Sequence, residues 1–426
     1  MKVTYDISLL GIGHRDPVNR TGTFRVVESI AHELLASEEC DLTFCASYSF
    51  QALSASLDYL RCCPKLEKVP LPHWKPKNII DNKLYEIDTK ISRSSEHDLP
   101  LQALRFGLKL TNKITESYSY PLNLKSLSKS DLYHSPCFPI PNTVKQIKNI
   151  KKFLTVYDLI PILFPHLFEL NNKEFLQEIL NSLDPQDWIL CISESTKNDL
   201  CNYLNNIDPA KVFVTPLAAS PNLFYPCSSV EDTISVQKKY HIPDAPYVLS
   251  ICTLEPRKNI DHVIRCFAKL VQEQKLKDLY LVLVGTKGWS YSKIFEEISN
   301  FDLVKDRIII TGYVADEDLA ALYSGALAFA YLSFYEGFGL PPLEAMQCGV
   351  PVITSNTSSL PEVVGDAGIM LDPLDVDGLC QSMLDIYSDS ALRKQMSWKS
   401  LERSKQFSWE KCIQETLAAY RTALSS

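Results

Sequence analysis

The stretch SFYEGFGLPPLEAMQCGV, residues 333–350, decides the fold of the C-terminal half of this chain. An apolar run, Leu327–Ser333, leads into it and predicts a buried strand. Pro342 is typical of a first helical turn, so we expect Leu343–Cys348 to be helical and Gly349 to end the helix. The pattern therefore predicts a strand, a glycine-rich loop and the N-terminus of a helix.

A loop of this kind is suited to binding a phosphate. Glycine lets the backbone come close to a ligand, and the free amides at a helix N-terminus favour an anion. The residues expected to make this approach are Gly337, Phe338, Gly339 and Leu340. The flanking acids, Glu336 and Glu344, could bind hydroxyl groups on either side of the phosphate, as in a nucleotide sugar. The alternative is an ordinary strand-to-helix connection whose acids cap and solvate the helix.

The string from Glu336 to Glu344 resembles the E-x7-E motif of the GT4 family of retaining glycosyltransferases. Other segments extend the resemblance: HSP at 134–136, VYDLIP at 156–161, SEST at 193–196 and LEPRKN at 254–259. The resemblance implies the α/β GT-B fold, in which two Rossmann-like domains with parallel sheets face each other across a cleft. It is greatest to mannosyl- and rhamnosyltransferases of bacterial surface-polysaccharide assembly. It implies transfer of a hexose from a GDP- or UDP-sugar co-substrate to a glycan or lipid-linked acceptor, with no other cofactor.

The C-terminal half alternates regularly between apolar runs and amphipathic stretches from Tyr247 onward. Repeated units of this length predict a parallel sheet covered on both faces, with ligands at the carboxyl ends of its strands. We expect a donor-binding domain at 220–407 and an acceptor-binding domain at 1–219, joined within the irregular stretch Ser220–Asp244. The resemblance implies that the last helix, at 408–426, packs back on the N-terminal domain.

Three further loops of this half are expected at the same sheet edge. Arg257 and Lys258 stand at a helix start, where two cations oppose the helix dipole unless an anion such as a diphosphate offsets them. Plain surface charge is the alternative. Gly285 ends one predicted strand and Val314 follows the next. In GT4 enzymes the position of Lys258 contacts the donor phosphates, and main-chain groups around that of Val314 contact the base.

The suggested mechanism is group transfer driven by a nucleoside diphosphate leaving group. Lys258, with Arg257 as a second cation, would stabilise the charge that develops on the diphosphate, together with the loop amides. Glu336 would hold sugar hydroxyls, and Glu344 the ribose. The resemblance implies retention of anomeric configuration. We favour a same-face attack in which the leaving phosphate accepts the acceptor proton.

The N-terminal half departs from the family pattern in two places. The usual glycine-rich run near the donor phosphate is reduced to a turn at Gly22, after a predicted strand at Lys2–Ile12. Tyr157 stands where surface-polysaccharide enzymes of the family often have a histidine near the sugar, and tyrosine is a poor base near neutral pH. Asp158 matches the family position and either orients an acceptor hydroxyl or caps the following segment.

Composition limits the class of protein. The chain has 426 residues, of which 46% are hydrophobic and 22% charged, as in a globular protein of two or three domains. No signal pattern is present and no apolar run reaches the roughly 18–20 residues that span a bilayer, so we expect a cytoplasmic protein with reduced cysteines. The net charge of −8 argues against general nucleic-acid binding. Residues 61–152, however, hold 17 lysines and arginines against 8 acids, and could contact the inner face of a membrane or form a solvated surface.

Other interpretations stay open. Tyr157 and the short glycine turn would suit a catalytically weak GT-B protein that binds sugar nucleotide or glycan as an assembly subunit. A nicotinamide-dependent oxidoreductase would need a glycine fingerprint that is missing here. The acidic pairs at 316–318 and 375–377 stand at predicted helix starts, so capping is expected and no metal site is predicted. The irregular region 53–100 is expected to face the acceptor.

Overall fold

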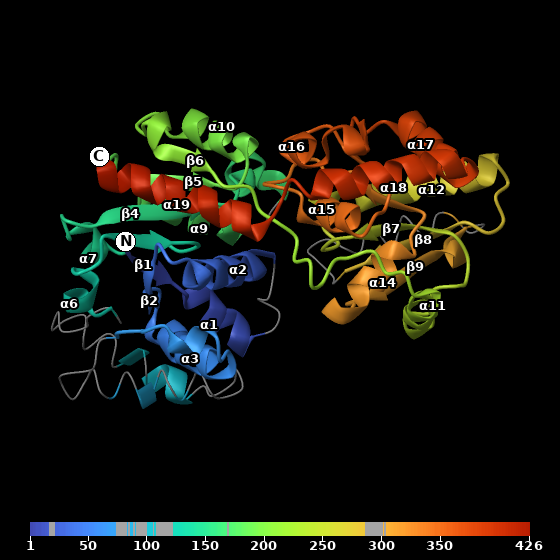
Figure 1. The fold of residues 1–426 in the computed structure, drawn as a ribbon. Helices are drawn as coiled ribbons and strands as arrows, with labels where there is room; N and C mark the ends of the chain where they lie inside the picture. Colours follow the sequence, from blue (N-terminus) through green and yellow to red (C-terminus); the bar gives the residue numbers. More distant parts are fainter. Residues whose placement is uncertain are drawn as a thin grey trace.

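The computed structural model describes residues 1–16, 22–73, 83, 86–87, 90, 100–104, 106–107, 122–167, 170–285, 301 and 304–426. In these ranges the chain forms two parallel six-stranded sheets, each with helices on its faces (Figure 1). The predicted α/β class with two parallel sheets is confirmed. Residues 74–82 and 91–99 of the expected acceptor-facing region lie outside the described residues, as do Thr286–Gly288 after the predicted site residue Gly285.

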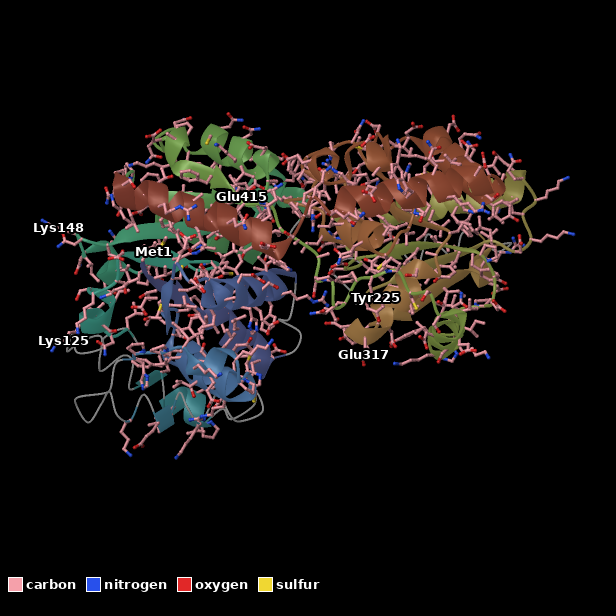
Figure 2. All side chains as sticks on the ribbon, viewed as in Figure 1. Met1, Lys125, Lys148, Tyr225, Glu317 and Glu415 are labelled. Atoms are coloured by element: carbon pink, nitrogen blue, oxygen red, sulfur yellow. The ribbon has the colours of Figure 1, made fainter. Side chains whose placement is uncertain are left out.

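The first sheet has the strand order β2-β1-β3-β4-β5-β6. Its strands are β1 (Lys2–Asp6), β2 (Asp41–Cys45), β3 (Leu132–Ser135), β4 (Lys151–Val156), β5 (Trp188–Cys191) and β6 (Val212–Val214). The helices of this half are α1 (Ser8–Arg15), α2 (Gly22–Ala36), α3 (Phe50–Cys62), α6 (Leu124–Leu127), α7 (Asn142–Lys145), α8 (Ile160–Leu163), α9 (Leu170–Asn181) and α10 (Glu194–Tyr203). Figure 2 shows the side chains on the ribbon, with Lys125 and Lys148 at the outer edge of this half.

The second sheet has the order β12-β11-β10-β7-β8-β9. Its strands are β7 (Tyr247–Ile251), β8 (Tyr280–Val284), β9 (Ile308–Gly312), β10 (Ala328–Tyr331), β11 (Val352–Ser355) and β12 (Ile369–Leu371). Its helices are α11 (Val230–Lys239), α12 (Ile260–Glu273), α14 (Leu319–Ser324), α15 (Leu340–Gln347), α16 (Leu360–Val364), α17 (Val376–Ser388) and α18 (Ser390–Ser404). The apolar runs of the sequence form these strands because both faces of the sheet are covered.

The last helix, α19 (Trp409–Ser425), returns to the first sheet and lies beside α2 (Figure 1). The Tyr420 hydroxyl lies 2.6 Å from Nδ1 of the buried His134 on β3, and its ring contacts Phe153 on β4. Arg421 pairs with Glu39 at 2.5 Å. The end of the chain is therefore part of the first half by packing, although it follows the second half in sequence.

Three predictions of local structure were wrong. The region 53–100, expected to be irregular, begins inside α3, which continues to Cys62. The first strand ends at Asp6 instead of Ile12, because the Asp6 carboxylate accepts a hydrogen bond from Ser8 N at 2.8 Å and α1 begins there. Gly11 lies inside α1, so close to Ser56 of α3 that a Cβ would not fit. The stretch Ser220–Asp244, predicted to be irregular, contains α11, whose N-cap Ser229 accepts from Asp232 N.

Candidate active site

A cavity of about 470 Å³ lies at the carboxyl ends of strands from both sheets and is lined by residues of both halves. Every predicted site residue lines it: Gly22, Tyr157, Asp158, Arg257, Lys258, Gly285, Val314, Glu336, Gly337, Phe338, Gly339, Leu340 and Glu344. The structure therefore brings together loops that are far apart in sequence. Their binding of a donor stays a prediction.

The glycine loop packs directly against the first half. Gly337 approaches Tyr157 O so closely that a Cβ at this position would collide with it. The Gly337 carbonyl accepts hydrogen bonds from Ser193 Oγ at 2.7 Å and Thr196 Oγ1 at 3.2 Å, on α10. Gly339 has φ of +121° and begins α15 without a side-chain cap, so no side chain occupies this helix start.

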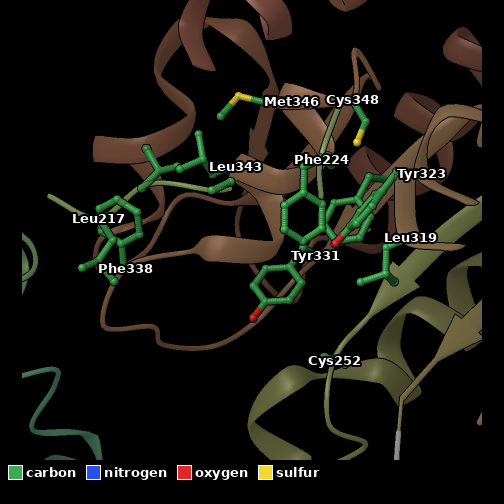
Figure 3. Packing of buried hydrophobic residues seen from close by; sticks show 14 of the residues in the cluster. Leu217, Phe224, Cys252, Leu319, Tyr323, Tyr331, Phe338, Leu343, Met346 and Cys348 are labelled. Atoms are coloured by element: carbon green, nitrogen blue, oxygen red, sulfur yellow. The ribbon is translucent and has the colours of Figure 1, made fainter. Parts of the chain in front are cut away.

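The apolar side of the same stretch anchors it in the core. Phe338 lies close to Leu217, and Leu343 and Met346 of α15 pack behind it (Figure 3). All three side chains of the stretch are almost fully buried. The loop is therefore held in place by packing on one side and faces the cavity with its backbone on the other.

Glu336 is the centre of a buried charge cluster. Its carboxylate lies 2.7 Å from Arg257 Nη1 and 2.7 Å from Lys258 Nζ, and accepts from the Tyr331 hydroxyl at 2.8 Å. Burial raises the pKa of Glu336, but the two cations outweigh it and hold the pKa at about 2. Arg257 also pairs with Glu255 at 2.8 Å. The cations at this helix start are therefore offset by protein carboxylates, and the charge argument for a diphosphate is not needed to explain them.

Glu344 is held from two sides. The Tyr323 hydroxyl donates to its Oε2 at 3.0 Å, and Arg25 Nη1 from α2 lies 3.9 Å from its Oε1. Burial raises the pKa of Glu344, while Arg25 and Tyr323 lower it. Arg25 also pairs with Asp316 at 2.5 Å. This ion pair joins the two halves across the cavity.

Sequence reasoning missed Arg25 and Asp316 as residues of this cavity. A signal was present, because Arg25 stands in the first turn of α2, where a cation opposes the helix dipole. Asp316 was expected to cap a helix; it pairs with Arg25 instead, and that prediction was wrong. Asp375 does cap, since it accepts from Gly378 N at 2.8 Å. Among the residues that the structure describes, no group of three metal-ligating side chains occurs.

Tyr157 and Asp158 border the cavity at the end of β4. The Tyr157 hydroxyl is buried, and it has no hydrogen-bond partner in the described part of the chain. Burial raises its pKa well above the ordinary value, so Tyr157 is no base. Asp158 Oδ1 accepts from Ile160 N at 3.0 Å, as a cap would. Burial raises the pKa of Asp158 more than the neighbouring Arg257 lowers it. The residue also borders the cavity.

Comparison with known sequences identifies the relatives of this chain. Residues 232–403 match the family described as "Glycosyl transferases group 1". "O-antigen chain mannosyltransferase B" of Escherichia coli is 36% identical over 294 residues, which are 69% of this chain and 74% of that protein. "Serotype-specific mannosyltransferase WbdA" of Escherichia coli is 31% identical over 278 residues, or 65% of this chain. The match spans only 34% of the length of that second relative.

Solved structures share the fold along the whole chain. Sucrose-phosphate synthase from Thermosynechococcus elongatus has a TM-score of 0.66 at 18% identity, covering 100% of this chain and 99% of that one. Anabaena HepE, solved with UDP and glucose, has a TM-score of 0.65 at 16% identity, covering 98% and 99%. At these identities the likeness shows the fold alone. The expected GT-B fold is confirmed.

Proposed function

This chain belongs to the group 1 glycosyltransferases, and we propose that it transfers mannose, with retention, from GDP-mannose to a growing bacterial surface polysaccharide. Two of its relatives are named O-antigen or serotype-specific mannosyltransferases, which favours this sugar and this kind of acceptor. The main structural support is the Glu336–Arg257–Lys258 cluster beside the glycine loop in the cavity. An assembly subunit without turnover is not favoured, because the relatives are transferases.

The residues at the cavity have distinct proposed roles. Lys258, which contacts Glu336 and the Tyr331 hydroxyl, is proposed to bind the diphosphate, and Arg257 adds a second positive charge beside it. The backbone at Gly337–Leu340 adds amides at the start of α15. Glu336, held ionised by the cations, accepts from sugar hydroxyls, and Glu344 accepts from the ribose. These groups stabilise the charge that develops on the leaving diphosphate.

The transfer step needs no further reactant. The bond between the anomeric carbon of the sugar and the diphosphate oxygen breaks, and the acceptor oxygen bonds to the same face of that carbon. The proton of the acceptor hydroxyl passes to the leaving phosphate oxygen. Asp158 is proposed to orient the acceptor hydroxyl, since its carboxyl group borders the cavity beside Arg257. Tyr157 borders the cavity as well, but its hydroxyl is buried and is assigned no contact with the substrate.

Asp316 favours guanine as the base. It lies two residues after Val314, where the family contacts the base, and both line the cavity. Guanine presents N1–H and a 2-amino group side by side, two donors that one carboxylate can accept. Uracil presents one N–H between two carbonyl oxygens, which a carboxylate repels. Asp316 forms an ion pair with Arg25 in this structure. When the base binds, this ion pair would break, or Asp316 would contact Arg25 and the base together.

Membrane contact is proposed for the basic region 61–152, at the inner face of a membrane. Lys125 and Lys148 are exposed at the outer edge of the first half, away from the cavity (Figure 2). Clustered cations near a surface attract anionic lipid. No helix in the described ranges is long and apolar enough to cross a bilayer.

Thermal unfolding with GDP-, UDP-, dTDP- and ADP-sugars tests the donor site. A donor at about 100 times its Kd should stabilise the protein by roughly 2.7 kcal/mol. We expect GDP-mannose to raise the Tm, and Lys258→Ala and Glu344→Ala to abolish the rise. Asp316→Asn should weaken the effect of GDP more than that of UDP. A folded protein whose Tm responds to no nucleotide sugar would contradict the proposal.

A further inference from the structure

A second cavity, of about 330 Å³, opens at the carboxyl edge of the first sheet, at the ends of β2 and β3. Its lining includes Tyr48, Asn142, Lys145, Glu178 and Asn181. The Tyr48 ring stacks on Phe138 with centroids 4.2 Å apart, yet 48% of this residue is exposed. Phe138 is itself buried and packs edge-on against Phe175. Tyr48 is therefore an aromatic surface with one face supported and the other open.

The polar groups around this ring are free to bind a ligand. The side chains of Asn142, Glu178 and Asn181 have no hydrogen-bond partner within the described ranges. The wall behind them is fixed, because Ser182 Oγ donates to Ile179 O at 2.6 Å and accepts from Ile140 N at 2.9 Å. Small-molecule sites typically combine an aromatic surface with a few polar groups that point into the same cavity.

The charges of this cavity select a neutral ligand. Lys145 forms an ion pair with Asp184 at 3.7 Å, so a carboxylate of the protein already lies beside its charge. Glu178 and Lys145 both line the cavity, and the acid of this pair would repel a phosphate. Amide groups donate and accept, as sugar hydroxyls do, and the C–H face of a sugar ring can cover the open face of Tyr48. The chemistry therefore fits an uncharged sugar better than a nucleotide.

Its position suits the acceptor of the proposed reaction. In the first sheet β2 is three strands from β4, which is about 14 Å at strand spacings of about 4.8 Å. Tyr157, at the end of β4, borders the main cavity, and Tyr48 follows β2 at the same edge. The separation of the two strand ends is therefore within the length of an oligosaccharide of a few sugar units.

We propose that the cavity at Tyr48 binds internal sugar units of the acceptor glycan, behind the end that receives the new sugar. This inference rests on the proposed function for the identity of the acceptor. It assigns to Tyr48, Asn142 and Asn181 a role in acceptor length preference that is separate from the donor site.

Isothermal titration of the full chain with an α-linked mannotetraose tests this site without any turnover. We expect wild type to bind, Tyr48→Ala to bind about tenfold more weakly, and Tyr48→Phe to bind like wild type because the ring is kept. Asn181→Ala should also weaken binding. Tyr203→Ala, which removes an exposed aromatic ring of the first half outside both cavities, is the matched control and should bind the tetraose normally. A Tm equal to that of wild type, measured without ligand, shows that each Tyr48 variant is folded.

Two results would overturn the inference: no binding of the tetraose by wild type at millimolar concentration, or equal affinity in wild type and Tyr48→Ala. The outcome is distinct from that of the proposed function. If the tetraose binds through Tyr48 but no mannose is transferred, only the proposed reaction fails. If mannose is transferred and the KM for the tetraose is unchanged in Tyr48→Ala, only the second site fails.

Discussion

Glu336 joins the electrostatics of the cavity to the stability of the protein. Burial, Arg257 and Lys258 together leave its pKa at about 2, below its ordinary value of 4.5. The unfolded state therefore binds more protons than the folded state between these pH values. The stability that this group contributes is complete above about pH 4.5 and is lost as the pH falls toward 2.

Glu336→Gln should abolish this acid-dependent contribution. It also leaves two buried cations without their carboxylate, so we expect a loss of about 3–5 kcal/mol near neutral pH. Urea unfolding of wild type and variant from neutral to acidic pH measures both effects. Glu402→Gln, which breaks an exposed pair with Lys405, is the control and should change little. Equal slopes of stability against pH in wild type and Glu336→Gln would show that the carboxylate is not held ionised.

Tyr157→Phe should not destabilise the protein, because the hydroxyl it removes is buried without a partner. We expect the free energy of unfolding to rise by about 1 kcal/mol, while turnover stays close to that of wild type because the hydroxyl is buried away from the substrate. Tyr247→Phe is the matched control, since its hydroxyl donates to Leu322 O at 2.6 Å and its loss should destabilise. A similar loss of stability in both variants would mean that the Tyr157 hydroxyl has a partner in the folded protein.

At the scale of elements, the glycine loop and α15 depend on backbone contact with the first half. Gly337→Ala places a Cβ against Tyr157 O, which cannot move without disturbing β4. We expect a lower Tm and a loss of turnover of more than about tenfold, measured with donor and acceptor saturating. At Gly22, by contrast, a Cβ would meet only Leu340 Cδ1 at 3.6 Å, an ordinary contact. Gly22→Ala should therefore keep the Tm of wild type; equal losses in the two variants would contradict the steric argument.

Elements with a strong local pattern could be predicted from the sequence. The predicted succession of strand, glycine loop and helix occurs, because apolar runs, glycines and prolines act locally, but the helix begins at Leu340, three residues before the predicted Leu343. The strand predicted to extend through Gly11 was wrong because Gly11 allows close packing of α1 on α3, which is a tertiary contact. The missed helix α11 had readable signals, a serine N-cap and lysines in its last turn, within a stretch that looked polar.

Contacts between distant parts of the chain could not be predicted. Arg25 and Asp316 are 291 residues apart, and nothing in either local sequence indicates the other. The positions Arg257, Gly285, Val314 and Glu336 were predictable because each follows the end of a strand, and the parallel strands of one sheet end at one edge. The cavity at Tyr48 has no motif, since it arises from the packing of α9 beside the ends of β2 and β3.

At the scale of the whole molecule, the two halves are joined at several points around the cavity. The Glu362 carboxylate, on α16, accepts from Glu194 N at 2.8 Å and Ser195 N at 2.7 Å, at the start of α10. Such bonds to a charged group at a helix N-terminus are worth about 1.5–3 kcal/mol. These two hydrogen bonds lie near the one that Ser193 Oγ donates to the Gly337 carbonyl. Together the three bonds hold the glycine loop against the first half.

Glu362→Ala should loosen the junction of the halves. We expect a lower free energy of unfolding and a larger radius of gyration in small-angle X-ray scattering, because the amides at the start of α10 lose their acceptor. Glu231→Ala, at an exposed position on α11, is the control and should leave the radius unchanged. An unchanged scattering curve for Glu362→Ala would mean that the other contacts hold the halves without it.

Transfer of mannose with retention is tested most directly by proton NMR of the chain incubated with GDP-α-mannose and an α-linked mannotetraose. We predict that GDP is released together with a new α-mannosidic anomeric signal, and that Lys258→Ala produces neither. Release of GDP with free mannose as the only product, a β-mannosidic signal, or no reaction by the folded protein would contradict it.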